Sequence, residues 1–588
     1  MRWLAFVLAS ALGVPAQAQL TAPVRNGDTT ITVTGTRARS ADARPELSDW
    51  RMAETPHVVV FGKGDEKDLR RTAHHLEKLH FLLTALLGRT DQPDETIKVA
   101  VTMIEDAGGF EQLRLTDLRW QYGPFPLEFA KTIYYDPRGE GSVIATTATD
   151  LNLALRPSTG RPTSRNCDLD DDSPLSTNFP VVRATNPESP PDSAEYLSQF
   201  SVNEIAVCQS ASSRLYAAFA QNYLMTHFPA AYPRWFLQGF GEMFGTMVAG
   251  NGTVDYGQRP AGFFKVIDRF GDYPVRDVLN GRYLTGKGRA WTPYHAWRMV
   301  HFLYFSDNWK PRLQRYLAEV AKGADPARAA DAFGDPGELQ RAVAIHRGSK
   351  APFDRLTFPA DRTPEPTVRR LTRAEAGLIR GRLELGARIE LPDADRAAAL
   401  ARRTAWLDRL RGNATRFPDL IENQLLLAEA ECRSGNPDPC LAAADRALAK
   451  APADIGALVW KGTALTQLAM RAPAANRGPR LAEARAHLVR ANRLDPQAIL
   501  PLIAYHDSFA VAGDPATDAA VGGLYKVVQS APAAPAPRLT LGKELVARNL
   551  HEDAVATLLP VAKGAFATPE QPAAAALLVK AEVAGPSR

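Results

Sequence analysis

The sequence predicts an α+β domain followed by an α-solenoid, which is an array of stacked helix pairs. Three observations support this fold class. Residues 57–104 read as strand, amphipathic helix and strand. Two strongly apolar helices are expected over residues 215–227 and 233–246, with a proline-containing break between them. From residue 372 onward the chain is rich in Ala, Leu and Arg, with a degenerate helical repeat of about 34 residues.

Composition places the chain among ordinary globular proteins. It has 588 residues, 23% of them charged, and a formal net charge of +5. This small charge, without a run of five or more basic residues, gives no indication of nucleic-acid binding. No later segment reaches the ~18 uninterrupted apolar residues of a membrane span, so no transmembrane helix is expected.

The N-terminus has the features of a secretory signal peptide. Arg2 precedes the apolar stretch Trp3–Val14, which is too short to span a bilayer, and residues 16–18 form an Ala-Gln-Ala cleavage site. We therefore expect residues 1–18 to be removed and residues 19–47 to form a disordered leader. The alternative is an N-terminal membrane anchor. Secretion across the inner membrane, to the periplasm, is the expected localisation.

A small strand–helix–strand unit follows the leader. Residues 57–61 form an apolar run, and apolar residues then recur at helical spacing until Gly88, which is expected to end the helix. His74, His75 and His80 lie on this helix at spacings of one and five. Because that spacing does not place two imidazoles one turn apart, we interpret them as surface or half-buried side chains.

A polar insertion is expected over about residues 156–192, which are rich in Pro, Ser, Asn and Asp. Within it, residues 168–172 faintly resemble a calcium loop. Ser173 and Phe179 replace the Gly and Glu that such a loop requires, so no calcium site is expected.

The second apolar helix carries a family resemblance. Residues 233–242 read Pro-Arg-Trp-Phe-Leu-Gln-Gly-Phe-Gly-Glu. This phrase resembles the one that holds the third zinc ligand in the gluzincins, zinc metallopeptidases of the thermolysin and aminopeptidase type. Their preceding helix carries His-Glu-x-x-His, and here residues 217–221 read Ala-Ala-Phe-Ala-Gln at that place. A helix over residues 294–303 also resembles one found in gluzincin-like proteins of unknown function.

All four functional positions of that resemblance are changed. Ala217 and Gln221 stand in place of the two His ligands, Ala218 in place of the general base, and Gln238 in place of the ligand Glu. Alanine has no lone pair, and a neutral amide is a poor zinc ligand and no general base. The resemblance thus implies a gluzincin-like domain over residues 48–347 with no catalytic residue, metal or cofactor, and a vestigial cleft formed with Glu242. An accidental likeness between two buried helices is the alternative.

The C-terminal part begins after an expected Pro-rich linker, residues 348–371. Thr372 and Glu375 have the spacing of a capping box that opens a helix. The repeat over residues 372–588 resembles the tetratricopeptide consensus. The positions that fit its small, apolar and closing-proline sites are Leu427, Ala428, Ala447, Pro452, Ala484, Leu488, Ala491 and Pro496. Three to five helix pairs are expected, with a plain helical bundle as the alternative.

Four cysteines in a secreted chain allow two disulfides in three pairings. Cys432 and Cys440 flank the turn of one expected helix pair, so a local bridge between them is plausible. Cys167 and Cys208 would then join the polar insertion to a helix that precedes the first apolar helix. Four unpaired thiols are the alternative.

These features predict a non-catalytic binding or scaffolding protein. Its helical repeats would hold a protein or peptide partner, and the old cleft an extended peptide. One alternative is a hydrolase with a rearranged, non-zinc site in the same cleft, built from Glu242, Arg234 and Tyr294. A plain structural protein is the third hypothesis.

Overall fold

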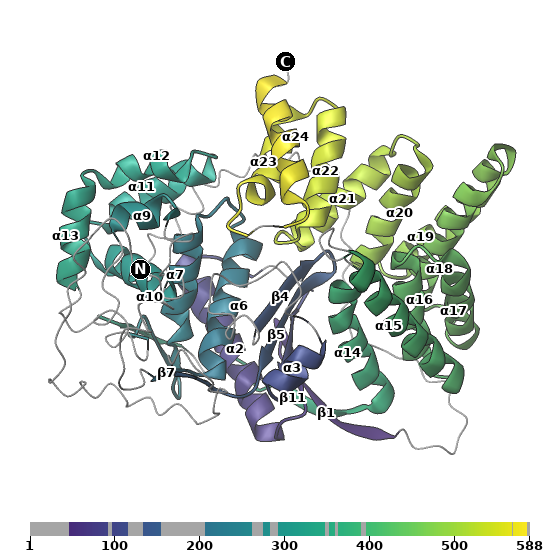
Figure 1. The fold of residues 1–588 in the computed structure, drawn as a ribbon, viewed down its shortest axis with the longest axis horizontal. Helices are drawn as coiled ribbons and strands as arrows, with labels where there is room; N and C mark the ends of the chain where they lie inside the picture. The colour runs from purple at the N-terminus through teal and green to yellow at the C-terminus, as the bar shows by residue number, and fades with distance from the viewer. Residues whose placement is uncertain are drawn as a thin grey trace.

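The computed structural model describes residues 46–91, 97–113, 115, 133–154, 206–260, 274–282, 292–346, 352–358, 363–389, 396–566 and 568–584. Within them, an α+β part is followed by a curved array of helix pairs packed beside it (Figure 1). The order predicted from the sequence is confirmed. The residues expected to form the signal peptide and the polar insertion lie outside the described residues, as do all but residues 46 and 47 of the expected leader.

A six-stranded mixed sheet forms the centre of the α+β part. Its strand order is β11-β1-β2-β3-β5-β4. Strands β2, β3 and β5 are parallel, with Val60 opposite Val101 and Val101 opposite Ile144, whereas β1, β4 and β11 pair in antiparallel fashion. The strand bounds are Leu47–Glu54 for β1, Val58–Gly62 for β2, Val99–Ile104 for β3, Ile133–Arg138 for β4, Gly141–Thr147 for β5 and Thr367–Thr372 for β11.

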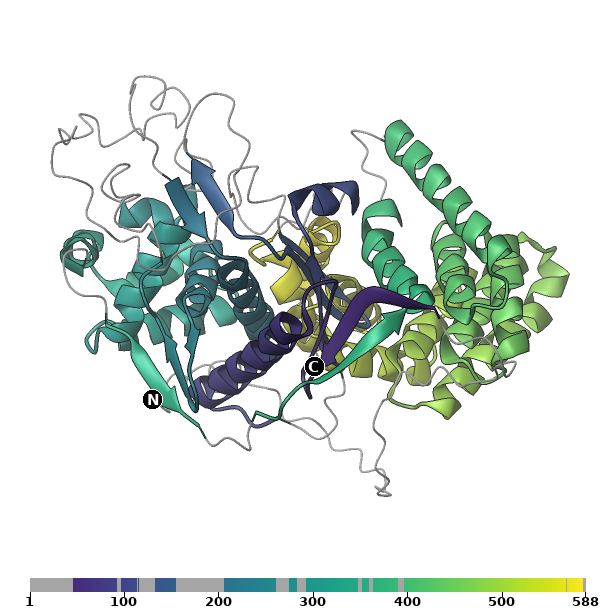
Figure 2. The same ribbon diagram turned by 90° about the horizontal axis from the view of Figure 1, so that it is seen from below.

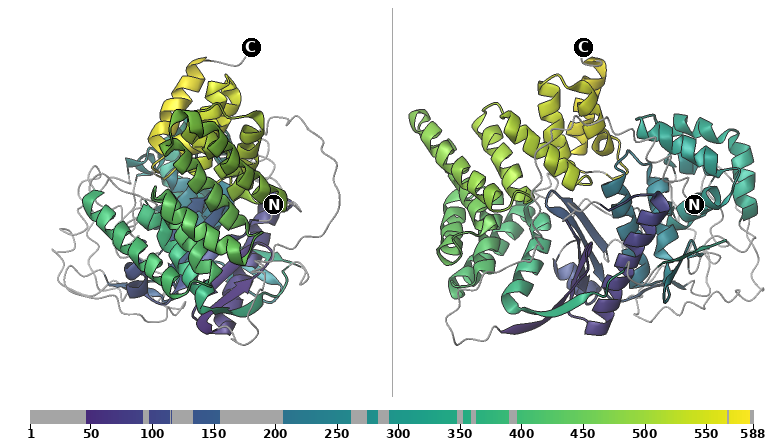
Figure 3. Two further views of the ribbon diagram at one scale, coloured as in Figure 1. Left: turned by 90° about the vertical axis from the view of Figure 1, so that its right-hand side faces the viewer. Right: turned by 180° about the vertical axis from the view of Figure 1, so that it is seen from behind.

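The sheet separates two hydrophobic cores. Helices α2 (Glu66–Leu87) and α6 (Ala211–His227) cover one face, while α3 (Ala107–Leu113) and α14 (Arg373–Ile389) cover the other. Because successive strand residues point to opposite faces, the neighbours Ile144 and Ala145 belong to different cores. Figure 3 shows the sheet between α2 and the helical array.

The predicted strand–helix–strand unit is confirmed as β2, α2 and β3. Gly88 ends α2 in the left-handed conformation, with φ of 65°, which glycine adopts without a steric penalty. Asp65 is the N-cap residue of α2, but its side chain makes no capping hydrogen bond.

Residues 348–371, expected to be a linker, contribute two strands to the α+β part. β10 (Asp354–Thr357) pairs with β9 (Thr253–Tyr256), and β11 pairs with β1 (Figure 2). Strands this short take their character from the edge that they pair with, which the local sequence does not reveal. The repeats are therefore joined to the sheet by a strand.

Helices and short strands make up the remainder of the α+β part. The two predicted apolar helices are confirmed as α6 and α7, and α6 begins earlier than expected because Ser210 caps it, accepting a hydrogen bond from the Ser213 amide. The further elements are β6 Leu151–Ala154, β7 Ala206–Gln209, α7 Arg234–Gly245, β8 Val248–Ala249, α9 Val275–Leu279, α10 Thr292–Phe305, α11 Lys310–Ala321, α12 Pro326–Ala329, η4 Ala330–Phe333 and α13 Pro336–His346.

The C-terminal part is a stack of helix pairs. Each helix packs on its sequence neighbour, and α14, α16, α18 and α20 also contact one another in succession, which is the packing of a tetratricopeptide-like array. The capping box is confirmed, since the Glu375 carboxylate accepts from the Thr372 amide at 2.8 Å. The helices after α14 are α15 Arg396–Arg416, α16 Ile421–Arg433, α17 Pro437–Lys450, α18 Ile455–Arg471, α19 Ala474–Leu494, α20 Ile499–Ala512, α21 Asp518–Ser530, α22 Pro535–Ala547, α23 His551–Ala562 and α24 Gln571–Ala584.

Cys432 and Cys440 form a disulfide across the turn between α16 and α17. Cys167 and the side chain of Cys208 lie outside the described residues. Among the helices that the structure describes, none combines the length and apolar character needed to cross a membrane.

Candidate functional site

The vestigial cleft predicted from the sequence falls where α6 and α7 cross. The crossing is close because α7 presents glycines: a Cβ added to Gly241 would lie 2.9 Å from the Ala217 carbonyl oxygen and would also collide with the Gln221 amide nitrogen. A Cβ on Gly245 would lie 3.4 Å from the Ala217 Cβ. Ala217 and Gln221 therefore face α7 directly, and no open space separates them from it.

All five predicted cleft residues are buried. Ala217, Ala218, Gln221, Gln238 and Glu242 have exposed fractions between 1% and 7%. The Gln221 Oε1 atom has no hydrogen-bond partner among the described residues. Two alanines and two amides do not constitute a zinc donor set, so the residues present do not fit the metal that the gluzincin resemblance implies.

Glu242 is the one ionisable group among these positions. Burial raises its pKa to about 7. Burial, together with the nearby charge of Glu242, also raises the pKa of the Tyr294 phenol. Arg234 is eight residues away on the same helix, about 12 Å along the axis, and its guanidinium lies 5.8 Å from the Phe566 ring. Of the three residues of the alternative hydrolase site, the structure therefore brings together only Glu242 and Tyr294.

The Glu242→Gln variant should be more stable than the wild type at pH 8 and equally stable near pH 4. A raised folded-state pKa means that both states are protonated below about pH 4.5, so no penalty exists there. Between that pH and about 7, Glu242 ionises in the unfolded state but stays protonated in the folded state. The free energy of unfolding of the wild type therefore falls by on the order of 3 kcal/mol. Unfolding in urea at both pH values measures this, and a variant equally stable to the wild type at pH 8 would contradict it.

The histidines of α10 have structural roles. His301 Nε2 lies 2.9 Å from the Gly257 carbonyl and 2.8 Å from that of Pro352, so this nitrogen carries a proton. His301 Nδ1 then accepts from His346 Nε2 at 2.9 Å. His295 is buried as well, and burial lowers its pKa to about 3. His295 and His301 are therefore packing residues of the α+β part.

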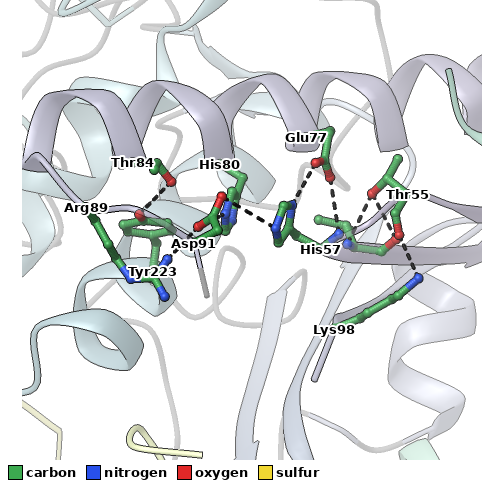
Figure 4. A network of polar contacts seen from close by, with 10 residues as sticks. Thr55, His57, Glu77, His80, Thr84, Arg89, Asp91, Lys98 and Tyr223 are labelled. Carbon is green, nitrogen blue, oxygen red and sulfur yellow. Dashed lines mark hydrogen bonds and ion pairs between the residues drawn. The ribbon is translucent and has the colours of Figure 1, made fainter. Parts of the chain in front are cut away.

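A polar cluster that the sequence did not predict lies at the other end of α6. His57, His80 and Asp91 bring their ligand atoms within 4.8 Å of one another (Figure 4). His80 is only 4% exposed, and is thus more buried than the interpretation of the α2 histidines allowed. The three residues come from the β1–β2 turn, from α2 and from the segment after α2, so no local spacing could indicate them.

A second unpredicted feature is the two-residue turn between β4 and β5, which inserts into the repeats. A Cβ on Gly139 would lie 2.8 Å from Ile503 of α20 and 3.4 Å from Pro537 of α22. The next residue, Glu140, accepts from Arg382 of α14 at 3.0 Å and lies 3.6 Å from Arg433 of α16. We call the surface formed by these four helices the inner face of the repeats.

Charge complements shape at this turn. Burial by itself would raise the pKa of Glu140, but the positive charges of Arg433, Arg382 and Arg138 outweigh it and lower the pKa. Arg138 also donates to the Arg382 carbonyl at 2.7 Å. The inner face thus holds an ionised carboxylate of the same chain.

Comparisons with known proteins identify no family for the chain. No protein-family model and no curated protein matches it. Among solved structures it is similar to a thermophilic tetratricopeptide protein of Thermus thermophilus, at 19% identity and a TM-score of 0.27, over 36% of this chain and 98% of that one. The description of the C-terminal part as a tetratricopeptide-like array depends on its helix packing, not on this weak superposition.

Proposed function

We propose that this protein is an exported, non-catalytic binding protein whose helical repeats hold a protein partner. The proposal depends on one observation: the inner face of the repeats binds the β4–β5 turn, because Arg382 and Arg433 pair with Glu140. Arginine recognises carboxylates with a rigid fork of donors. A partner segment that carries an acidic residue has the chemistry to pair with these arginines where it displaces the turn.

Chemical cross-linking tests which part binds. The full chain carries lysines on both parts, for example Lys461 and Lys526 on the repeats and Lys67 and Lys310 on the α+β part. After cross-linking in an envelope extract, mass spectrometry should find one partner attached through the lysines of the repeats. Cross-links confined to the lysines of the α+β part would reject the repeats as the binding element.

We further propose that α6 and α7 are a gluzincin-like core that has lost its chemistry. The support is the close α6–α7 crossing, with Ala217 and Gln221 facing α7. Restoring the motif with Ala217→His, Ala218→Glu, Gln221→His and Gln238→Glu should create a zinc site if the scaffold has that geometry. The experiment uses protein that also carries His80→Ala, so that the cluster of His57, His80 and Asp91 cannot take up the zinc instead. A folded quadruple variant that takes up no zinc would reject this part of the proposal.

Export is supported by residues 1–18 and by the Cys432–Cys440 disulfide, because structural disulfides persist in oxidising compartments. The chain produced without residues 1–18 should remain in the cytoplasm, whereas the full chain should appear in the periplasmic fraction.

A further inference from the structure

The side chains around His57 are held in place by hydrogen bonds and ring contacts. His57 Nδ1 lies 2.7 Å from Glu77 Oε1, and the His57 backbone amide donates to Glu77 Oε2 at 3.4 Å. Glu77 is 3% exposed, and its Oε1 atom accepts the Nδ1 proton at this distance. This bond fixes the tautomer and leaves the lone pair on His57 Nε2, which faces Asp91 at 3.6 Å.

His80 is fixed by its ring contacts. Its ring stacks on that of His57 with a centroid distance of 3.7 Å and an interplanar angle of 8°, and it meets Tyr223 edge-on at 5.2 Å. Tyr223 is held in turn by Thr84 at 2.8 Å. His80 Nε2 therefore points to Asp91 Oδ1, 3.1 Å away.

Asp91 completes the arrangement with one oxygen toward each imidazole. Arg89 Nη1 lies 2.5 Å from Asp91 Oδ1, so the arginine orients the carboxylate and leaves Oδ2 toward His57. Figure 4 shows His57, His80 and Asp91 converging between α2 and the strands. His57 and Asp91 keep 25% and 34% of their side chains exposed, which provides an entry path and room for a water ligand.

We propose that His57, His80 and Asp91 bind one divalent transition-metal ion of the zinc class. Two imidazoles and one carboxylate, with a fourth position open to water, are a donor set that zinc takes readily. Bond lengths of about 2.0–2.2 Å require ligand atoms about 3.4 Å apart in a tetrahedral site. His80 Nε2 lies 3.1 Å from Asp91 Oδ1 and His57 Nε2 lies 3.6 Å from Asp91 Oδ2, so the carboxylate presents one oxygen to each imidazole at about this spacing.

The remaining adjustment is between the two imidazoles. The two rings stack in parallel and cannot both direct an in-plane lone pair at one ion, so metal binding requires the more exposed His57 ring to rotate out of the stack. Because all three ligand atoms lie within 4.8 Å, this rotation has to bring the two nitrogens closer by at most about 1.5 Å. The Glu77–His57 bond is the outer contact that usually orients a metal-binding imidazole. This site departs from the expectation that the chain binds no metal, which rested on residues 217–238, on the spacing of the α2 histidines and on the incomplete calcium loop. Bound metal would join the β1–β2 turn to the C-terminal end of α2.

Metal titration of the full chain tests the site. Tag-free protein is stripped with a chelator, dialysed and titrated with zinc by calorimetry, and cobalt is substituted to record its d–d absorption. We expect one equivalent of metal, tetrahedral cobalt bands and a zinc-dependent rise in melting temperature. The Glu77→Gln variant should bind about 10–100-fold more weakly, as the loss of an outer contact predicts.

Variants of the ligands decide the outcome. His80→Ala and the isosteric Asp91→Asn should each lose more affinity than Glu77→Gln, and His487→Ala, a half-buried histidine of α19, should bind as the wild type does. Asp91→Asn keeps the side-chain shape, so it separates lost ligation from misfolding, which circular dichroism checks. Wild-type protein that takes up no zinc, or binds it no better than Asp91→Asn, would overturn the proposal. Neither result bears on binding by the repeats or on the restored motif, which uses other residues.

Discussion

The Gly239→Ala variant is expected to lose about 3 kcal/mol of stability or more, a large effect for a single added methyl group. Gly239 lies where α7 crosses α10, and a Cβ there would overlap the backbone oxygen of Ala296 and lie 2.5 Å from Val300. A backbone oxygen cannot rotate away as a side chain can. The two helices would have to separate, which would disturb the buried positions of α7 on both sides.

A matched control exists in the helical array. Gly412 lies inside α15 with no atom within 4 Å of an added Cβ. Alanine is the better helix former, so Gly412→Ala should raise the free energy of unfolding by up to about 1 kcal/mol. Chemical denaturation of both variants measures the difference. Equal stabilities would mean that α7 and α10 are not in close contact in solution.

The Glu140→Gln variant is expected to lose roughly 2 kcal/mol, because it removes one of the two carboxylates, Glu140 and Glu429, that pair with Arg382 and Arg433. Glu140 has 18% of its side chain exposed, against 38% for Arg382 and 35% for Arg433. This partial exposure places the loss below the full cost of breaking a buried pair. Glutamine keeps the shape of the side chain, so the effect isolates the charge.

The pH dependence of this effect has a defined sign. A lowered pKa means that Glu140 contributes stability above its unfolded value near 4.5, and that this contribution is lost as the pH falls through the folded value. The gap between wild type and Glu140→Gln should therefore close in acid. The exposed pair of Glu319 and Lys322 serves as a control, since Glu319→Gln should cost less than about 0.5 kcal/mol. A gap that is independent of pH would indicate a packing defect instead.

Elements whose periodic pattern extends over many residues could be predicted from the sequence. The apolar helices α6 and α7, the capping box at Thr372 and the helix pairs all depend on contacts within a few residues, so the local pattern contains them. Strand β11 could not be predicted, because its six residues are stabilised by pairing with β1 about 300 positions earlier.

The same reason explains the missed polar sites. His57, His80 and Asp91 come from three segments, and His80 and Asp91 meet only because Gly88 reverses the chain at the end of α2. Glu140 occupies a hairpin turn, where an acidic residue is ordinarily solvated. Its partners Arg382 and Arg433 lie more than 200 positions away, and only the fold brings them to Glu140.

The pairing of β1 with β11 affects the order in which the chain can be assembled. β1 emerges early from the ribosome, but the strand that covers its outer edge follows more than 300 residues later. At about 5–20 residues per second, that edge stays open for roughly 15–60 s of synthesis. An uncovered strand edge is a template for pairing between chains. During this interval the nascent protein can aggregate through the open edge of β1. The edge is covered only when translation reaches the first repeat helix.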